Sequence, residues 1–138
     1  MNVHEDNGMF KFNHIALAVK DVAISIAFYQ QLFDFKEIAN TASSSNTRWL
    51  SLDGYHQFHL IPRPEVKINT NKAIHFALST IEFQTFIIKL KQLKINYSDW
   101  LGTTHKNYRR KDGIQQVYLQ DPDGYWIEIN NDIYIKKE

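Results

Sequence analysis

The sequence contains no cysteine. This absence excludes a disulfide-stabilised scaffold, a thiolate metal site and a cysteine nucleophile, so any bound metal ion must take nitrogen and oxygen ligands. A strong charge of one sign is also lacking, because 16 basic residues stand against 15 acidic ones. Such a balance argues against a surface for nucleic acid or an anionic membrane. The sequence has no apolar run of membrane-spanning length and no signal-peptide core in residues 1–10. We therefore expect a soluble, cytoplasmic protein.

The composition fits one compact domain. The chain has 138 residues, of which 43% are hydrophobic and 14% aromatic, and this is ample for a packed core. Residues 1–9 are polar and are expected to form a flexible N-terminus. The predicted domain therefore spans residues 10–138.

Hydrophobic periodicity predicts an alternation of strands and helices. Strands are expected at 10–19, 35–38, 48–52, 55–61, 72–79, 95–100, 114–119 and 125–130. Helices are expected at 22–32, with Asp21 as a plausible N-cap, and at 81–93. Polar loops are expected at 40–47 and 101–113, and residues 62–71 are the best candidate linker.

The two halves of the chain repeat each other. NHIALAVKD from Asn13 aligns with IHFALSTIE from Ile74 at an offset of 61 residues, which places His14 on His75. Each repeat, 10–62 and 72–131, reads as strand, helix and three strands. Each final hairpin also carries Asp-Gly-Tyr, but one residue of slippage, such as a bulge, is needed to superpose His59 on Glu128. We expect the first and last strands of both repeats to line a shared cavity.

Four residues on those strands are candidate metal ligands, namely His14, His59, His75 and Glu128. Imidazole nitrogens and a carboxylate suit zinc, iron, nickel or manganese. A single histidine in a strand is more often a core or surface residue than a ligand, but the matched positions of His14 and His75 favour a shared role. Glu128 is an acid between Ile127 and Ile129, which must face the helices, so it is expected to face the cavity. His56 competes with His59 for the ligand position in the fourth strand.

The remaining polar and aromatic candidates concern substrate recognition. Arg109, Arg110 and Lys111 form a basic cluster that is most simply a solvated loop, although arginine also suits carboxylate binding. Arg110, Trp49 and Trp100 are the substrate-binding candidates. His4 and His105 are interpreted as surface residues.

Two motifs resemble a known superfamily. Residues 12–37, FNHIALAVKDVAISIAFYQQLFDFKE, are similar to the opening of the glyoxalase/bleomycin-resistance/extradiol-dioxygenase superfamily, also called vicinal oxygen chelate. DPDGYWIEI at 121–129 closely resembles the closing motif of lactoylglutathione lyases. The resemblance implies an α+β fold in which two βαβββ modules form a curled mixed sheet around a divalent metal. It also implies a homodimer, often with ligands from both subunits.

The resemblance assigns roles to the four candidates. Family ligands correspond to His14, His59, His75 and Glu128, of which Glu128 would also act as a base. In the lyases the position of His59 commonly holds a glutamate, so the two-base lyase mechanism lacks one carboxylate here. His59 could instead ligate the metal or act as a base.

A metal-dependent lyase or isomerase of glyoxalase type is the leading hypothesis for function. It would act on a small oxygen-chelating substrate through an enediolate. The alternatives are an iron(II) extradiol-type dioxygenase, an antibiotic-resistance thiol transferase, and a non-enzymatic drug-binding dimer. The sequence defines neither the substrate nor the metal, which could be Zn, Ni, Fe or Mn.

Overall fold

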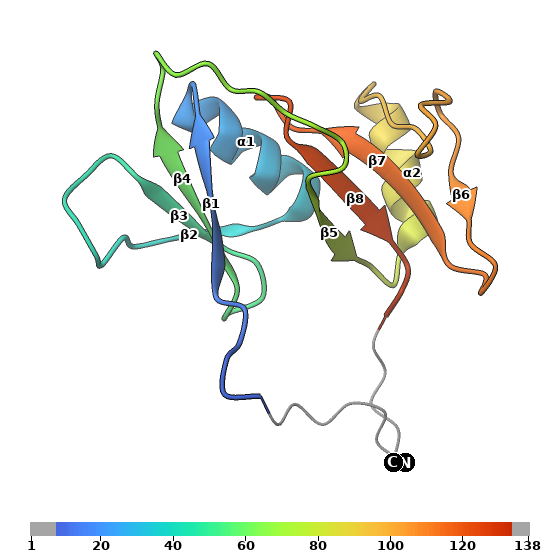
Figure 1. Ribbon diagram of the computed structural model, residues 1–138, viewed down its shortest axis with the longest axis horizontal. Coiled ribbons are helices and arrows are strands. Elements are labelled where there is room, and N and C mark those ends of the chain that lie inside the picture. The colour runs from blue at the N-terminus through green and yellow to red at the C-terminus, as the bar shows by residue number, and fades with distance from the viewer. Residues whose placement is uncertain (1–7, 134–138) are drawn as a thin grey trace. The chain divides into compact units, whose positions relative to one another are not determined.

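The computed structural model describes residues 8–133, and these form two units of similar construction (Figure 1). One unit comprises residues 8–69 with 122–124, and the described part of the other comprises 70–121 with 125–133. Each unit has one four-stranded mixed sheet and one helix. The predicted α+β fold of two βαβββ modules is therefore confirmed. Residues 1–7 of the expected flexible N-terminus lie outside the described part of the chain.

The first module contains five elements in the predicted order. They are β1 (His14–Val19), α1 (Val22–Phe33), β2 (Lys36–Ile38), β3 (Arg48–Ser51) and β4 (Gln57–Pro62). The sheet order is β1-β4-β3-β2, with β1 parallel to β4 and the other pairs antiparallel. The parallel pair brings the first and last strands of the module side by side.

Local chemistry fixes the start of α1 and its packing. The Asp21 carboxylate accepts hydrogen bonds from the backbone N–H groups of Ala23 and Ile24, which confirms it as the N-cap. Tyr29 is fully buried on the inner face of α1. Its ring meets that of Phe58 edge-on, with centroids 5.1 Å apart. The apolar residues of β4 therefore point into the core, and the residues that alternate with them along the strand point to the opposite face of the sheet.

The second module repeats this arrangement. Its elements are β5 (His75–Ser79), α2 (Phe83–Gln92), β6 (Tyr108–Arg109), β7 (Gln115–Gln120) and β8 (Trp126–Asn130). The sheet order is β5-β8-β7-β6, again with the first and last strands parallel. Leu90 of α2 and Ile127 and Ile129 of β8 are buried, so the opposite face of β8 carries Glu128.

The edge strand of the second module differs from the prediction. Residues 95–100 are not a continuous strand, and only Ser98 pairs with β7, opposite Tyr118. The edge resumes at β6, where Tyr108 pairs with Gln116. The two edge residues that pair with β7 are therefore ten positions apart, at 98 and 108, whereas their partners in β7 are only two positions apart. Residues 99–107 loop out between them, and we call this segment the excursion. Asp99 holds this excursion together, because its buried carboxylate accepts from the Thr103 N–H at 2.7 Å.

The last strands of the two modules are in the same register with their partners. His14 pairs with Gln57 and His75 pairs with Trp126, so the ladders start at equivalent positions. The slippage expected between the two hairpins is taken up before the strand, because β4 begins two residues after Tyr55. A bulge is therefore not needed to align the strands. Across residues 8–133, neither helix is long and apolar enough to cross a membrane.

Candidate functional site

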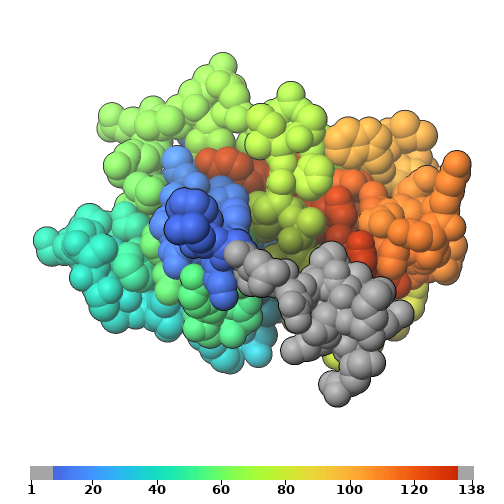
Figure 2. Space-filling view, turned by 60° about the horizontal axis from the view of Figure 1, so that its bottom comes forward, coloured from blue at the N-terminus to red at the C-terminus, as the bar shows by residue number. Residues whose placement is uncertain are grey.

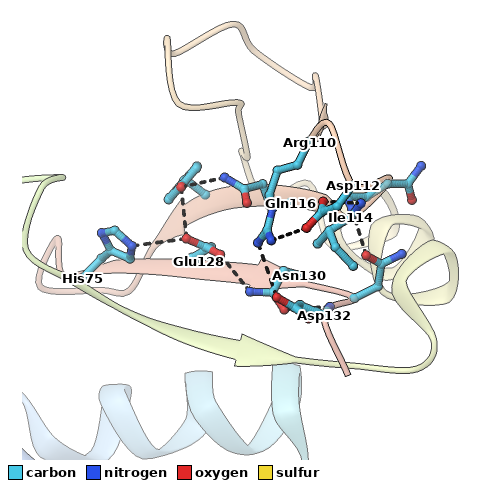
Figure 3. A network of polar contacts seen from close by, with 11 residues as sticks. His75, Arg110, Asp112, Ile114, Gln116, Glu128, Asn130 and Asp132 are labelled. Carbon is cyan, nitrogen blue, oxygen red and sulfur yellow. Dashed lines mark hydrogen bonds and ion pairs between the residues drawn. The ribbon is translucent and has the colours of Figure 1, made fainter. Parts of the chain in front are cut away.

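Glu128 lies at the centre of a hydrogen-bonded cluster in the second module (Figure 3). Its Oε1 accepts from the Tyr118 hydroxyl at 3.0 Å and lies 3.2 Å from His75 Nε2. Its Oε2 accepts from the Asn130 amide at 2.8 Å. The side chain is 12% exposed, so these partners compensate for burying an acid. This cluster brings together two of the four predicted ligands, His75 and Glu128.

Sheet register places these side chains next to each other. Glu128 in β8 lies opposite Ala77 in β5 and opposite Tyr118 in β7. Directly opposed residues on one face have Cβ atoms roughly 5 Å apart, which allows the phenol to reach the carboxylate. The small side chain of Ala77 leaves room for the neighbouring His75 ring to reach Glu128. A larger residue at position 77 would stand between the His75 ring and Glu128, which explains the alanine at this position.

A backbone contact orients the His75 ring. Nδ1 of His75 lies 2.9 Å from the Lys72 carbonyl, which can only accept, so Nδ1 carries a proton. In the neutral ring Nε2 then holds a lone pair that faces the Glu128 carboxylate. Two electron-rich atoms approach each other in this way when a proton or a cation lies between them. The donor set therefore fits a metal ligand pair with an oriented histidine.

The first module brings the other two predicted ligands together. The rings of His14 and His59 stack with centroids 3.9 Å apart, and the His59 ring stacks on Trp49 at 4.1 Å. Nδ1 of His14 lies 2.7 Å from the Asn13 side-chain oxygen, which again assigns the proton to Nδ1. His14 Nε2 is then the nitrogen with the lone pair, as in His75.

His59 has a different environment from His14. Its Nε2 donates to the side-chain oxygen of Gln57 at 2.8 Å. Burial lowers the pKa of His59, and the nearby charge of His14 lowers it further. The neutral ring is therefore favoured, with its Nε2 proton engaged by Gln57. Nδ1 is the nitrogen through which His59 could act as a ligand or a base.

Each unit by itself supplies a pair of candidate ligands. Within residues 8–133, no group of three or more His, Cys, Asp or Glu side chains lies close enough to hold a metal ion. The full set of His14, His59, His75 and Glu128 therefore stays a prediction. His56, the competing candidate, lies in the turn before β4 and bonds to Asp53 at 2.7 Å.

Two of the three predicted substrate-binding residues lie beside the candidate ligand pairs. Trp49 covers His59, and the Trp100 ring lies 6.2 Å from that of His75. Arg110 forms ion pairs with Asp112 at 2.5 Å and Asp132 at 3.4 Å (Figure 3). The roles of these residues in binding substrate stay predictions.

The loops predicted for substrate recognition are also at the surface. Residues 40–47 (cyan) and 101–113 (orange) are largely exposed (Figure 2). His105 lies in the second of these loops, as the surface interpretation requires, whereas His4 is outside the described residues.

Tyr118 is a site residue that the sequence patterns missed. Burial raises its pKa to about 12, as do the charge and hydrogen bond of Glu128, while the charge of Arg110 lowers it. The phenol therefore remains a hydrogen-bond donor at neutral pH. The register set by the DPDG turn could have identified Tyr118, because a tight hairpin places it opposite Glu128.

Comparison with known proteins identifies relatives for nearly the whole chain. The family model described as Glyoxalase/Bleomycin resistance protein/Dioxygenase superfamily matches residues 11–129. The metallothiol transferase FosB of Lysinibacillus sphaericus is 31% identical over 136 residues, which cover 91% of this chain and 89% of the relative. FosB of Bacillus licheniformis is 26% identical over 131 residues, covering 91% and 78%.

Solved structures share the fold. The fosfomycin resistance protein FosX of Listeria monocytogenes superposes with a TM-score of 0.72 at 19% identity, covering 90% of this chain and 92% of FosX. A putative glyoxalase family protein of Bacillus anthracis gives a TM-score of 0.70 at 18% identity, covering 91% and 98%. These structural matches extend over both modules.

Proposed function

Because the chain belongs to the glyoxalase/bleomycin resistance protein/dioxygenase superfamily, we propose that it is a metal-dependent thiol transferase that modifies an antibiotic of the fosfomycin type. The observation that carries the proposal is the 31% identity to a metallothiol transferase over 91% of this chain. Thiol transfer is one of the alternatives to a glyoxalase-type lyase that the sequence leaves open, and the relatives favour that alternative. The superfamily resemblance seen in the sequence is confirmed.

The proposal includes a divalent metal ion of open identity. The relatives named metallothiol transferases support it, and so do the nitrogen and oxygen donors of the site. We assign His14, His75 and Glu128 as ligands, since both histidines carry their proton on Nδ1 and present Nε2. When bound, the metal would supply Lewis acidity at an oxygen of the substrate. His59 is kept as the fourth candidate, either as ligand or as base.

Thiol transfer to an epoxide has a simple balance of bonds. The sulfur lone pair forms a C–S bond while a C–O bond of the epoxide breaks, and the released oxygen takes up the proton that the thiol gave up. Tyr118 contributes by holding the Glu128 carboxylate with a proton that it retains at neutral pH. Arg110 is proposed to attract the anionic group of the substrate, while Asp112 and Asp132 hold its guanidinium.

The site favours this chemistry over a two-base lyase. His59 stands where a second carboxylate would be needed. Glu128 has both oxygens engaged, by Tyr118 and Asn130, which suits a positioned ligand better than a mobile base. The dioxygenase and the drug-binding dimer remain weaker proposals. The homodimer expected from the resemblance is also retained as a proposal, and light scattering of the purified protein would test it.

A panel of substrates tests the proposed function. Metal-loaded protein is incubated with fosfomycin and glutathione or L-cysteine, with the hemithioacetal of methylglyoxal, and with catechol under oxygen. The proposal expects a thiol adduct of fosfomycin, detected by mass spectrometry, and no comparable turnover of the other two. Isomerisation of the hemithioacetal without formation of a fosfomycin adduct would contradict thiol transfer and support the glyoxalase-type lyase instead.

A further inference from the structure

Lys72 precedes β5, and its ammonium group contacts the start of the excursion of residues 99–107. Nζ donates to the backbone carbonyls of Asp99 and Trp100, at 2.8 Å each, and lies 3.5 Å from Ser98 Oγ. An ammonium has three N–H donors, and each has an acceptor here. Lys72 therefore has no donor left for a substrate anion, and its contacts tie the excursion to the start of β5.

Three aromatic rings surround the same ammonium. Nζ lies 5.5 Å from the ring centroid of Trp100, 5.0 Å from that of Tyr118 and 4.9 Å from that of Trp126. All three distances are within the range of cation–π attraction, which is stronger for a partly desolvated cation. The rings come from the excursion, β7 and β8, so one charge draws three segments together.

We propose that Lys72 is a positioning residue that fixes Trp100 as a wall of the substrate site. The Trp100 ring lies 6.2 Å from the His75 ring and 5.4 Å from the Tyr118 ring. Trp100 is nevertheless 46% exposed, so part of it remains available to a ligand. Without the lysine side chain, the carbonyls of Asp99 and Trp100 lose this donor and become hydrated, and the Trp100 ring becomes mobile. We call the contacts of the Lys72 ammonium with the two carbonyls and the three rings the clamp. The expected effect on kinetics rests on the proposed function, whereas the clamp itself does not.

The repeat provides a matched control. Lys11 lies three positions before His14, and Lys72 lies three positions before His75, so the offset of 61 that relates the histidines also relates the lysines. Lys11 is exposed, in contrast to the half-buried Lys72. The Lys72 carbonyl that bonds to His75 belongs to the backbone. Side-chain variants therefore remove the clamp and leave this contact in place.

Fluorine NMR tests the clamp without reference to activity. The chain has three tryptophans, and 5-fluorotryptophan labelling gives one resonance for each. Lys72→Met removes the charge and donors, and we expect the Trp100 and Trp126 resonances to shift and the Trp100 line to narrow. The Trp49 resonance should stay unchanged. Lys11→Met should reproduce the parent spectrum. Should Lys72→Met not fold, Lys72→Gln takes its place, because it removes the charge and has only two N–H donors on a shorter side chain.

Kinetics of thiol transfer test the role in substrate binding. We expect Lys72→Met to raise KM for fosfomycin about tenfold with kcat changed less than threefold, and Lys72→Arg to restore most of the loss. Trp100→Ala should raise KM similarly. The double variant should show no further rise in KM, since both changes act on the same wall of the substrate site. A merely structural role would lower stability without this split between KM and kcat.

The two proposals can fail separately. Parent-like tryptophan resonances and KM in folded Lys72→Met would overturn the positioning role. Additive effects of Lys72→Met and Trp100→Ala would also overturn it. If the parent protein transfers no thiol, the proposed function fails, but the fluorine resonances still decide whether Lys72 holds Trp100.

Discussion

His59 and Glu128 occupy the same position in the two modules. His59 lies opposite Ala16 on one side and Trp49 on the other, and Glu128 lies opposite Ala77 and Tyr118 in the same way. The same position thus holds a stacked imidazole in one module and a hydrogen-bonded carboxylate in the other. The two modules have diverged at the residues that would decide between a two-base lyase and other metal-dependent chemistry.

The difference between His14 and His59 gives a first prediction. His14→Ala should weaken Mn²⁺ binding at least 100-fold in a metal titration, because it removes a ligand. His59→Gln should retain most of the affinity, because Nε2 of His59 is engaged by Gln57 and its ring stacks between Trp49 and His14. His56→Gln, in the exposed turn, is the control. An equal loss of affinity in His59→Gln and His14→Ala would make His59 a ligand.

Tyr118 is expected to act through Glu128. Tyr118→Phe removes the hydrogen bond to Oε1, which should lower metal affinity about 10-fold or more, as for other groups that hold a metal ligand. The free energy of unfolding should fall by about 1–2 kcal/mol, since a buried carboxylate loses a partner. Urea denaturation and metal titration measure the two effects. Tyr108→Phe, in the exposed β6, should change neither.

The turn before β4 should contribute to acid stability. The hydrogen bond from the His56 ring lowers the pKa of Asp53 to about 2, and the N–H groups of Tyr55 and His56 lower it too. Because the folded-state pKa lies below the ordinary 3.8, this stabilisation is complete above about pH 4 and is lost as pH falls towards 2. Asp53 is half exposed, so solvent screening limits the effect to about 0.5 kcal/mol.

Denaturation at different pH values checks the Asp53 prediction. The difference in stability between the parent and Asp53→Asn should shrink between pH 4 and pH 2. A difference that stays constant over this range would contradict the assignment to Asp53.

Arg110 is expected to contribute through its charge. Arg110→Lys should keep partial activity, whereas Arg110→Met should raise KM for an anionic substrate by about tenfold or more, because a lysine keeps the charge but not the paired donors. Steady-state kinetics at low and high salt measures the effect, and the parent should lose affinity as salt rises. Arg109→Met, on the neighbouring exposed position of β6, is the control. Equal KM values for both methionine variants would remove Arg110 from the site.

Much of the fold could be predicted from the repeat and the alternation of apolar residues. Asp21 identified the start of α1, and Ile127 and Ile129 correctly directed Glu128 to the opposite face. The split edge strand could not be predicted, because residues 95–100 alternate like a strand although only Ser98 pairs with β7. At that point the Thr103 N–H donates to the Asp99 carboxylate four residues away. The Lys72 ammonium also donates to the Asp99 and Trp100 carbonyls, and contacts between such distant residues have no local pattern.

The candidate site was predicted in part for similar reasons. Its histidines and Glu128 stand at repeated or apolar positions that a sequence reveals. Tyr118 has no such signal, and the match of Lys72 with Lys11 in the repeat does not reveal its contacts. The proposed roles come from cross-strand register for Tyr118 and from the carbonyl groups of Asp99 and Trp100 for Lys72. Contacts of this kind depend on pairing between strands that are distant in sequence, which local periodicity does not encode.

The most direct test follows adduct formation while metal is returned to stripped protein. Metal-free protein is titrated with Mn²⁺ in the presence of fosfomycin and a thiol, and the adduct is quantified by mass spectrometry. The proposed function predicts a rate that rises to a plateau near one equivalent per chain and that is lost in Glu128→Gln. No adduct at any metal concentration, or an adduct formed equally well by metal-free protein, would contradict it.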